Sequence, residues 1–174
     1  MTLRGRGPRP VRSRPAVRGA ASVQPGPQTG VVADEIVHPV NVRYLEVDIQ
    51  GVVFNMWYLA YVDDAMTAFL SAHGLSYPEL LAAGCDVQVV HAELDWRDGL
   101  RWAEDASVAV RLLHVGTTSF RLGYEFRRGA DPVATAELVY VCMATDGSGK
   151  RPIPPMLRTG LGLPRPNGQP PGGT

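Results

Sequence analysis

The chain has 174 residues, with 17 basic and 17 acidic side chains and a formal net charge of zero. This length is enough for one domain with a substantial core, and no apolar run approaches the roughly 18 residues of a membrane span, so we expect no membrane partner. The two cysteines and four histidines show no spacing typical of metal ligands, so we predict no metal site. We expect Cys85 and Cys142 to be reduced, half-buried residues of a cytoplasmic protein.

Composition separates the ends of the chain from its middle. Residues 1–33 contain six arginines, no acidic residue and many Pro, Gly and Ser residues, and residues 164–174 are similarly rich in Pro and Gly. Neither segment has the apolar periodicity that would offset the entropy lost on ordering, so we predict two disordered tails around one domain at residues 34–163. The basic first tail lacks helix-turn-helix periodicity, and we expect no nucleic-acid partner.

The first elements of the domain are a strand, a turn and a long helix. Residues 36–46 are rich in β-branched side chains and predict a strand. After a Gly-containing turn at residues 48–51, apolar positions at spacings of three and four predict a helix over residues 55–73, which Gly74 ends. The apolar stripe of this helix consists of Leu59, Val62, Met66, Phe69 and Leu70.

Beyond the long helix the apolar period changes from about 3.6 residues to about 2. Ser76 and Glu79 form the pattern of a capping box, which predicts a short helix before Gly84. Four alternating runs follow and predict four antiparallel strands. Their apolar positions include Val90, Ala92, Leu94, Trp96, Val108, Val110, Leu112, Phe120, Leu122, Tyr124, Phe126, Ala134, Ala136 and Leu138. Only the long helix can cover the apolar face of such a sheet, so we predict an α+β fold, a curled antiparallel five-stranded sheet around one long central helix.

Asp48 lies in the turn a few residues before the long helix. A carboxylate there can converge on a bound carbonyl together with the free N–H groups and the positive dipole end of the helix. The structural alternative is a loop Asp that bonds its own turn. Asp63 and Asp64 are a tempting pair, but adjacent helical side chains point about 100° apart, so we do not expect them to converge on one atom.

The stretch reads Arg43-Tyr44-x-Glu46-x-Asp48-x-x-Gly51-Val52-Val53-Phe54, with Tyr58-Leu59 following in the helix. It resembles the motif of the hotdog-fold acyl-CoA thioesterases of the 4-hydroxybenzoyl-CoA thioesterase family. Weaker agreement follows at residues 116–120 and 151–154, and the resemblance covers about residues 36–160. It implies the hotdog fold.

The resemblance also implies an acyl-CoA thioesterase, which hydrolyses a thioester to a carboxylic acid and a free thiol. In that family the residue matching Asp48 is the catalytic carboxylate, as nucleophile or general base, and a backbone N–H near Asn55 binds the oxyanion. The resemblance implies no cofactor other than the coenzyme A of the substrate. It further implies a homodimer or homotetramer whose sheets join edge to edge, with active sites at the dimer interface. Substrate contacts are expected from Gly51, Val52, Trp57, Tyr58, Thr118 and Ser119.

Three positions depart from the family pattern. Asn55 replaces the usual His or Tyr and keeps only its backbone N–H for the oxyanion, and Trp57 replaces the usual Asn, where it can reshape the acyl pocket. Thr117 stands where relatives often carry a basic residue, so an acyl-carrier-protein thioester stays an alternative substrate. A non-catalytic acyl-CoA-binding protein is a second alternative. A dehydratase or hydratase is disfavoured because residues 39–72 contain no His, and the acyl group stays open.

Other charged residues have weaker predicted roles. Glu46 would share a face with Asp48 if both lay on a strand, as a supporting or purely structural residue. Arginine suits phosphate binding, but surface ion pairing is its default role. The candidates for the CoA phosphates are Arg97, Arg101, Arg127, Arg128, Arg151 and Arg158.

Overall fold

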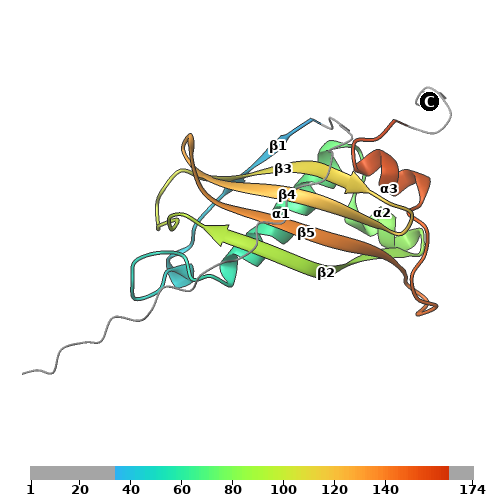
Figure 1. The fold of residues 1–174 in the computed structure, drawn as a ribbon, viewed down its shortest axis with the longest axis horizontal. Coiled ribbons are helices and arrows are strands. Elements are labelled where there is room, and N and C mark those ends of the chain that lie inside the picture. The colour runs from blue at the N-terminus through green and yellow to red at the C-terminus, as the bar shows by residue number, and fades with distance from the viewer. Residues whose placement is uncertain (1–33, 165–174) are drawn as a thin grey trace, which may run out of the picture.

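The structure, a computed structural model, describes residues 34–164 (Figure 1). The two predicted tails, residues 1–33 and 164–174, fall outside this range apart from Pro164. In chain order the elements are β1 (Ile36–Val40), η1 (Tyr44–Glu46), α1 (Trp57–Ala72), α2 (Tyr77–Ala82), β2 (Cys85–Trp96), β3 (Ala106–Val115), β4 (Ser119–Arg128), β5 (Asp131–Ala144) and α3 (Pro155–Gly160). Across the described range, no helix has both the length and the hydropathy needed to cross a bilayer.

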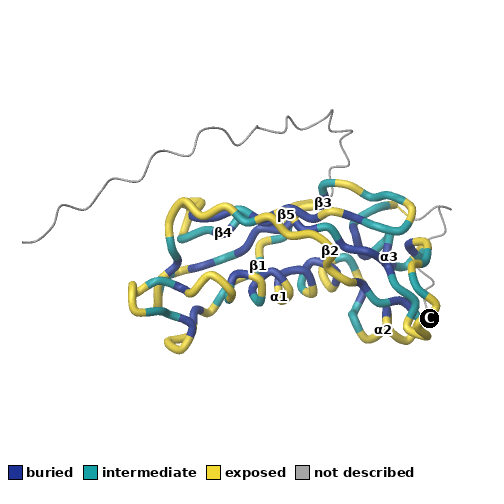
Figure 2. The backbone as a smooth tube through the Cα atoms, turned by 60° about the horizontal axis from the view of Figure 1, so that its bottom comes forward, coloured by how far each residue is buried: buried dark blue, intermediate teal, exposed yellow. Residues whose placement is uncertain are grey.

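The five strands form one sheet in the order β1-β3-β4-β5-β2, and every neighbouring pair is antiparallel. Helix α1 lies along one face of this sheet, and α2 and α3 lie at one end of it (Figure 2). The predicted α+β class, the five-stranded sheet and the central helix are therefore confirmed. The arrangement is the hotdog fold that the resemblance implies.

The core lies between α1 and the sheet. Of the predicted apolar stripe, only Leu59 is exposed, by 42%, because the buried face of the helix begins one residue earlier, at Tyr58. The buried residues of α1 are Tyr58, Tyr61, Val62, Ala65, Met66, Phe69 and Leu70. The apolar positions predicted for β3, β4 and β5 are also buried, so the period-2 pattern identified the inner face of these strands.

Two local signals that end or start helices are confirmed. Gly74 follows α1 with a φ of 79°, in the left-handed region that favours glycine. The Ser76 hydroxyl accepts a hydrogen bond from the Glu79 N–H at the start of α2, and the Glu79 side chain bonds back to Ser76.

The strand predicted over residues 36–46 is wrong in its second half. Strand β1 ends at Val40, and Tyr44–Glu46 form a 3-10 turn. The cause is the Glu46 carboxylate, which accepts hydrogen bonds from the backbone N–H of Arg43 (2.8 Å) and from its side-chain Nε (2.7 Å). These contacts span three residues, and an extended chain would hold the two residues too far apart to make them.

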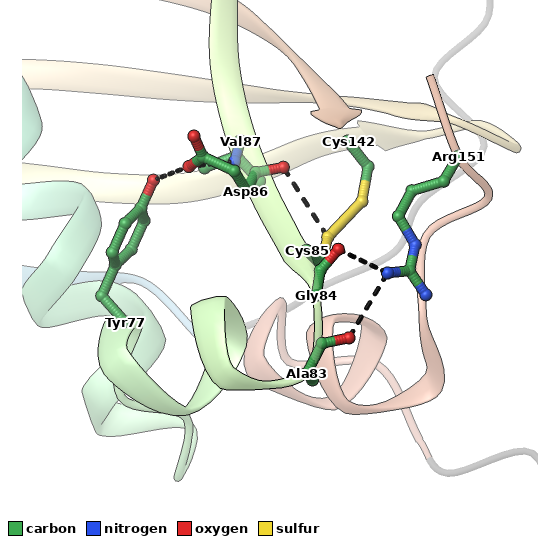
Figure 3. Close-up of a disulfide and its surroundings, with 8 residues drawn as sticks. All are labelled: Tyr77, Ala83, Gly84, Cys85, Asp86, Val87, Cys142 and Arg151. Atoms are coloured by element: carbon green, nitrogen blue, oxygen red, sulfur yellow. Dashed lines mark hydrogen bonds between the residues drawn. A yellow bond between two sulfur atoms is a disulfide. The ribbon is translucent and has the colours of Figure 1, made fainter. Parts of the chain in front are cut away.

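The prediction of two reduced cysteines is also wrong. Cys85, at the start of β2, and Cys142, near the end of β5, form a disulfide, and both are fully buried (Figure 3). Their Cα atoms are 6.5 Å apart because the register of these strands places Val87 opposite Cys142. Beside the disulfide, the Arg151 guanidinium donates to the carbonyls of residues 83 and 84 at the end of α2. Cysteine usage therefore does not support the prediction of a cytoplasmic location.

Candidate functional site

Asp48 lies at the turn of a short hairpin formed by residues 47–53, which we call the Asp48 hairpin. Val47 and Val53 pair antiparallel at its base. The Asp48 N–H donates to the Val52 carbonyl at 2.9 Å, next to the turn. The hairpin therefore connects the 3-10 turn to the segment that enters α1.

Local contacts orient the Asp48 carboxylate. Its Oδ1 accepts a hydrogen bond of 2.7 Å from the Gln50 N–H, which is the contact of an Asx turn. The Gly51 N–H donates to the Asp48 carbonyl at 3.0 Å, and Gly51 has a φ of 77°. The structural alternative for Asp48 is thus present, yet Oδ2 has no hydrogen-bond partner in residues 34–164. Asp48 as a whole is half-buried.

The strand of the hairpin that leads into α1 is held from both sides. On one side the Phe54 N–H donates to the Glu46 carbonyl at 2.9 Å. On the other side the Val53 N–H donates to the Leu100 carbonyl at 2.8 Å. Leu100 belongs to the segment between β2 and β3, residues 97–105, which we call the 97–105 loop. The position of Asp48 therefore depends on the neighbouring 3-10 turn, which contains Glu46, and on the 97–105 loop, which is distant in the sequence.

The start of α1 offers unpaired backbone donors. The Trp57 N–H donates to the Phe54 carbonyl at 2.9 Å, so it is already engaged. Within the described part of the chain, the N–H groups of Asn55 and Met56 have no acceptor at hydrogen-bond distance, and both residues are exposed. They lie at the positive end of the helix dipole. These two donors and the Asp48 carboxylate lie on adjoining segments of the chain, the hairpin and the residues that enter α1.

Glu46 has a structural role beside this site. It is 1% exposed, and its carboxylate accepts a hydrogen bond of 2.5 Å from the Tyr61 hydroxyl in addition to those from Arg43. Burial by itself would raise the pKa of Glu46, but the hydrogen bonds from Tyr61 and Arg43 outweigh it and hold the pKa below its usual value. The charge of Glu46 therefore ties η1 to α1.

The predicted substrate contacts near Asp48 have different environments. Gly51 and Val52 lie on the Asp48 hairpin itself. Trp57 is half-buried, and the Arg43 guanidinium lies 5.3 Å from its ring centre, which is a cation–π contact. Tyr58 has no exposed surface, and its hydroxyl accepts a hydrogen bond of 3.1 Å from the Leu100 N–H. Its position fits an anchor within the core and not a contact with substrate.

Thr118 and Ser119 lie at the other end of the sheet. The Cys142 N–H donates to the Thr118 carbonyl, next to the disulfide. Strand β4 runs over ten residues from Ser119 to Arg128, whose guanidinium pairs with Asp98 of the 97–105 loop at 2.9 Å. Ten residues of strand span about 30 Å. A single chain therefore does not bring Thr118 and Ser119 to Asp48.

Asp63 lines a cavity of about 330 Å³ beside β2, which the sequence did not predict. Asp64 lines a different cavity, near β1. The two carboxylates therefore point apart, as expected from helix geometry. Burial, and to a smaller extent the charge of Asp64, raises the pKa of Asp63. The spacing of Asp63 and Met66 predicts that they share one face of the helix. No local pattern in the sequence predicts that Tyr140 of β5 lines the same cavity.

Most of the candidate phosphate-binding arginines already have partners. Arg101, Arg127 and Arg128 pair with carboxylates, and Arg151 donates to backbone carbonyls. In residues 34–164 the side chains of Arg97 and Arg158 have no carboxylate or carbonyl partner. Phosphate binding by any of these arginines stays a prediction.

The chain is similar in sequence to known thioesterases. Residues 42–161 match the sequence profile of the family described as the Thioesterase-like superfamily. The chain is 25% identical over 122 residues to a 1,4-dihydroxy-2-naphthoyl-CoA hydrolase of Synechococcus elongatus, covering 69% of this chain and 90% of the relative.

Solved structures share the fold. A 1,4-dihydroxy-2-naphthoyl-CoA thioesterase from Synechocystis superimposes with a TM-score of 0.67 at 23% identity, covering 74% of this chain and 96% of that one. A gentisyl-coenzyme A thioesterase superimposes with a TM-score of 0.67 at 22% identity, covering 72% of this chain and 99% of that one.

Proposed function

Because the chain belongs to the Thioesterase-like superfamily, we propose that it is an acyl-CoA thioesterase in which Asp48 is the catalytic carboxylate. The observation that carries this proposal is the paired hairpin of residues 47–53. It connects directly to the start of α1, where the N–H groups of Asn55 and Met56 are unpaired within the described range. A carboxylate and an oxyanion site on adjoining segments are what thioester hydrolysis requires.

The reaction adds water across the thioester C–S bond. Asp48 either attacks the carbonyl carbon, giving a mixed anhydride that water hydrolyses, or removes a proton from the attacking water. In both routes the carbonyl oxygen gains negative charge, and the N–H groups near Asn55 stabilise it. A preorganised donor of this kind contributes about 10²–10³ in rate. Coenzyme A leaves as a thiolate and takes up a proton, so the products are a carboxylic acid and a free thiol.

The names of the relatives suggest the substrate class. They describe enzymes acting on 1,4-dihydroxy-2-naphthoyl-CoA and gentisyl-CoA, which are CoA thioesters of hydroxylated aromatic acids. Aromatic acyl-CoA is therefore the class proposed here, and acyl-carrier-protein thioesters are the alternative to be compared with it.

The active assembly proposed here is a homodimer that pairs β2 with β2 of a second chain. Strand β2 is an edge strand, and its residues 88–93 are all exposed, including Val89 and Val90. Such an apolar free edge favours pairing with another strand. An antiparallel two-fold pairing turns the second chain end for end, so that the Thr118 end of one chain comes alongside the Asp48 end of the other.

The test of this function is a thiol-release assay on a panel of acyl-CoA thioesters with the variant Asp48→Asn. The amide oxygen of Asn can still accept the Gln50 N–H, so the turn is preserved while the charge is lost. We expect the wild type to release thiol from aromatic acyl-CoA, and Asp48→Asn to lose at least about 100-fold of this activity.

Asp146→Asn is the matched control. Asp146 makes the same contact with the N–H of Ser148, two residues on, but it lies in the turn after β5. This variant should keep wild-type activity. Turnover retained by Asp48→Asn, or acyl-CoA binding without thiol release by the wild type, would contradict the proposal.

A further inference from the structure

A chain of hydrogen bonds leads from the first turn of α1 to Asp48. The Tyr58 hydroxyl oxygen accepts the Leu100 N–H (3.1 Å), and the Leu100 carbonyl accepts the Val53 N–H (2.8 Å). Val53 is the base of the Asp48 hairpin, and the adjacent Val52 carbonyl accepts the Asp48 N–H (2.9 Å). The backbone of Leu100 therefore connects α1, which follows the proposed donors Asn55 and Met56, to the hairpin that bears the carboxylate.

The anchor of this chain is fixed by packing. Neither Tyr58 nor Leu100 has exposed surface. The Tyr58 ring packs edge-on against Phe126 of β4, with ring centres 4.9 Å apart, and against Trp96 of β2, at 5.9 Å. A ring held by two strands leaves its hydroxyl little freedom, so the position of Leu100 is set by the core of the molecule.

A close contact holds the 97–105 loop against the same hairpin. A Cβ placed on Gly99 would lie 2.6 Å from Cγ1 and 2.7 Å from Cβ of Val52. The Val52 side chain is β-branched and stiff, so it cannot move aside without moving its backbone. Gly99 therefore allows a backbone approach that no larger residue would permit.

We infer that Tyr58 is a positioning residue for the proposed hydrolysis, because its buried hydroxyl fixes the 97–105 loop and thereby the distance between the Asp48 carboxylate and the start of α1. This inference rests on the proposed function. It assigns Tyr58 no contact with substrate. A displacement of about 1 Å between reacting groups is enough to lower a rate substantially, so a remote hydroxyl can control the chemical step.

The test is the variant Tyr58→Phe, measured as kcat and KM on the best substrate of the panel. Phe keeps the ring and its packing and removes only the acceptor of the Leu100 N–H. We expect kcat to fall by at least about tenfold while KM stays within about twofold, because the carboxylate is misplaced and the substrate surface is unchanged. Gly99→Ala should lower kcat with the same small effect on KM.

Two control variants separate positioning from a general loss of stability. Tyr124→Phe also removes a buried hydroxyl, which bonds to Tyr140 at 2.6 Å, away from the hairpin. Gly160→Ala creates an equivalent clash, with Leu75 Cδ2 at 2.6 Å, in α3. Both controls should lower the melting temperature and leave kcat within about twofold of the wild type.

The inference is overturned if Tyr58→Phe keeps wild-type kcat, or if the Tyr124→Phe control loses as much kcat as Tyr58→Phe. Amide hydrogen exchange provides a readout that does not depend on activity, since Tyr58→Phe should accelerate exchange at Leu100 and Val53. If the wild type releases no thiol, the proposed function has failed. If the wild type is active, Asp48→Asn is inactive and Tyr58→Phe is unchanged, only this inference has failed.

Discussion

The hydroxyl of Tyr61 donates a hydrogen bond of 2.5 Å to the carboxylate of Glu46, and both side chains are buried. The contact joins α1 to the 3-10 turn that precedes the Asp48 hairpin. The ionised carboxylate of Glu46 therefore helps to hold the segment that leads to the proposed site. The pH dependence of stability should reveal the contribution of this charge.

Replacing Glu46 by Gln should destabilise the protein in a pH-dependent way. The pKa of Glu46 lies below its usual value in the folded state, so its charge stabilises the fold above the unfolded pKa of about 4.5, and this contribution is lost as the pH falls through the folded pKa. Glu46→Gln should therefore cost about 1–3 kcal/mol near pH 7, and the difference from the wild type should shrink below about pH 4.5.

Thermal or urea unfolding of both proteins between about pH 7 and about pH 3 measures this difference, because the range must extend well below the unfolded pKa of Glu46. Glu137→Gln is the control, because the Glu137 side chain forms an exposed pair with Arg121 at 3.6 Å, and its loss should change stability by less than about 1 kcal/mol. A difference between the wild type and Glu46→Gln that stays constant over the whole pH range would contradict the assigned role of the charge.

The disulfide between Cys85 and Cys142 should be detectable by thiol labelling. In denaturant without reductant the wild type should incorporate no alkylating reagent, and after reduction it should incorporate two equivalents. Because the disulfide closes a loop with a sequence separation of 57, reduction should lower the free energy of unfolding by about 2–4 kcal/mol.

The double variant Cys85→Ala/Cys142→Ala serves as the control for reduction. Its melting temperature should not respond to dithiothreitol, whereas that of the wild type should fall. Two reactive thiols in the denatured wild type before reduction would show that the pairing does not exist in the isolated protein.

A charged residue in the middle of the β2 edge should separate the proposed dimer. Val90 is 58% exposed on this edge, so Val90→Lys should shift the mass measured by light scattering toward that of the monomer and reduce thiol release with it. Val37→Lys makes the same change on β1, the opposite edge, where Val37 is 51% exposed, and it should leave both mass and activity unchanged. Dissociation by Val37→Lys in place of Val90→Lys would move the interface to the other edge.

Local patterns in the sequence were enough to predict most of the fold. The helix around Val62 and Phe69 follows from spacings of three and four, and β3, β4 and β5 follow from alternation, since both patterns repeat within a few residues. In β2 the alternation predicted a strand but not a buried face, because Val90 and Trp96 are exposed. The capping box at Ser76 and the left-handed Gly74 are equally local. The turn predicted at residues 48–51 is also present, although the pairing of Val47 with Val53 that makes it a hairpin was not predicted.

Long-range contacts account for what the sequence did not predict. The Cys85–Cys142 pairing depends on the register of β2 against β5, and the Tyr58–Leu100 contact joins residues separated by 42 positions. No short pattern encodes either contact. The end of β1 at Val40 was missed because a side-chain contact at the start of η1, between Arg43 and Glu46, overrode the β-branched composition of the segment.

Asp48 and Thr118 lie near opposite ends of β4, and this separation has a consequence for genetic complementation. If each reaction centre combines the acid of one chain with the hydroxyl end of its neighbour, a subunit damaged at one end still carries an intact contribution at the other. Co-expressing two differently inactivated copies should then restore part of the activity, because a mixed pair contains one centre built entirely from undamaged halves.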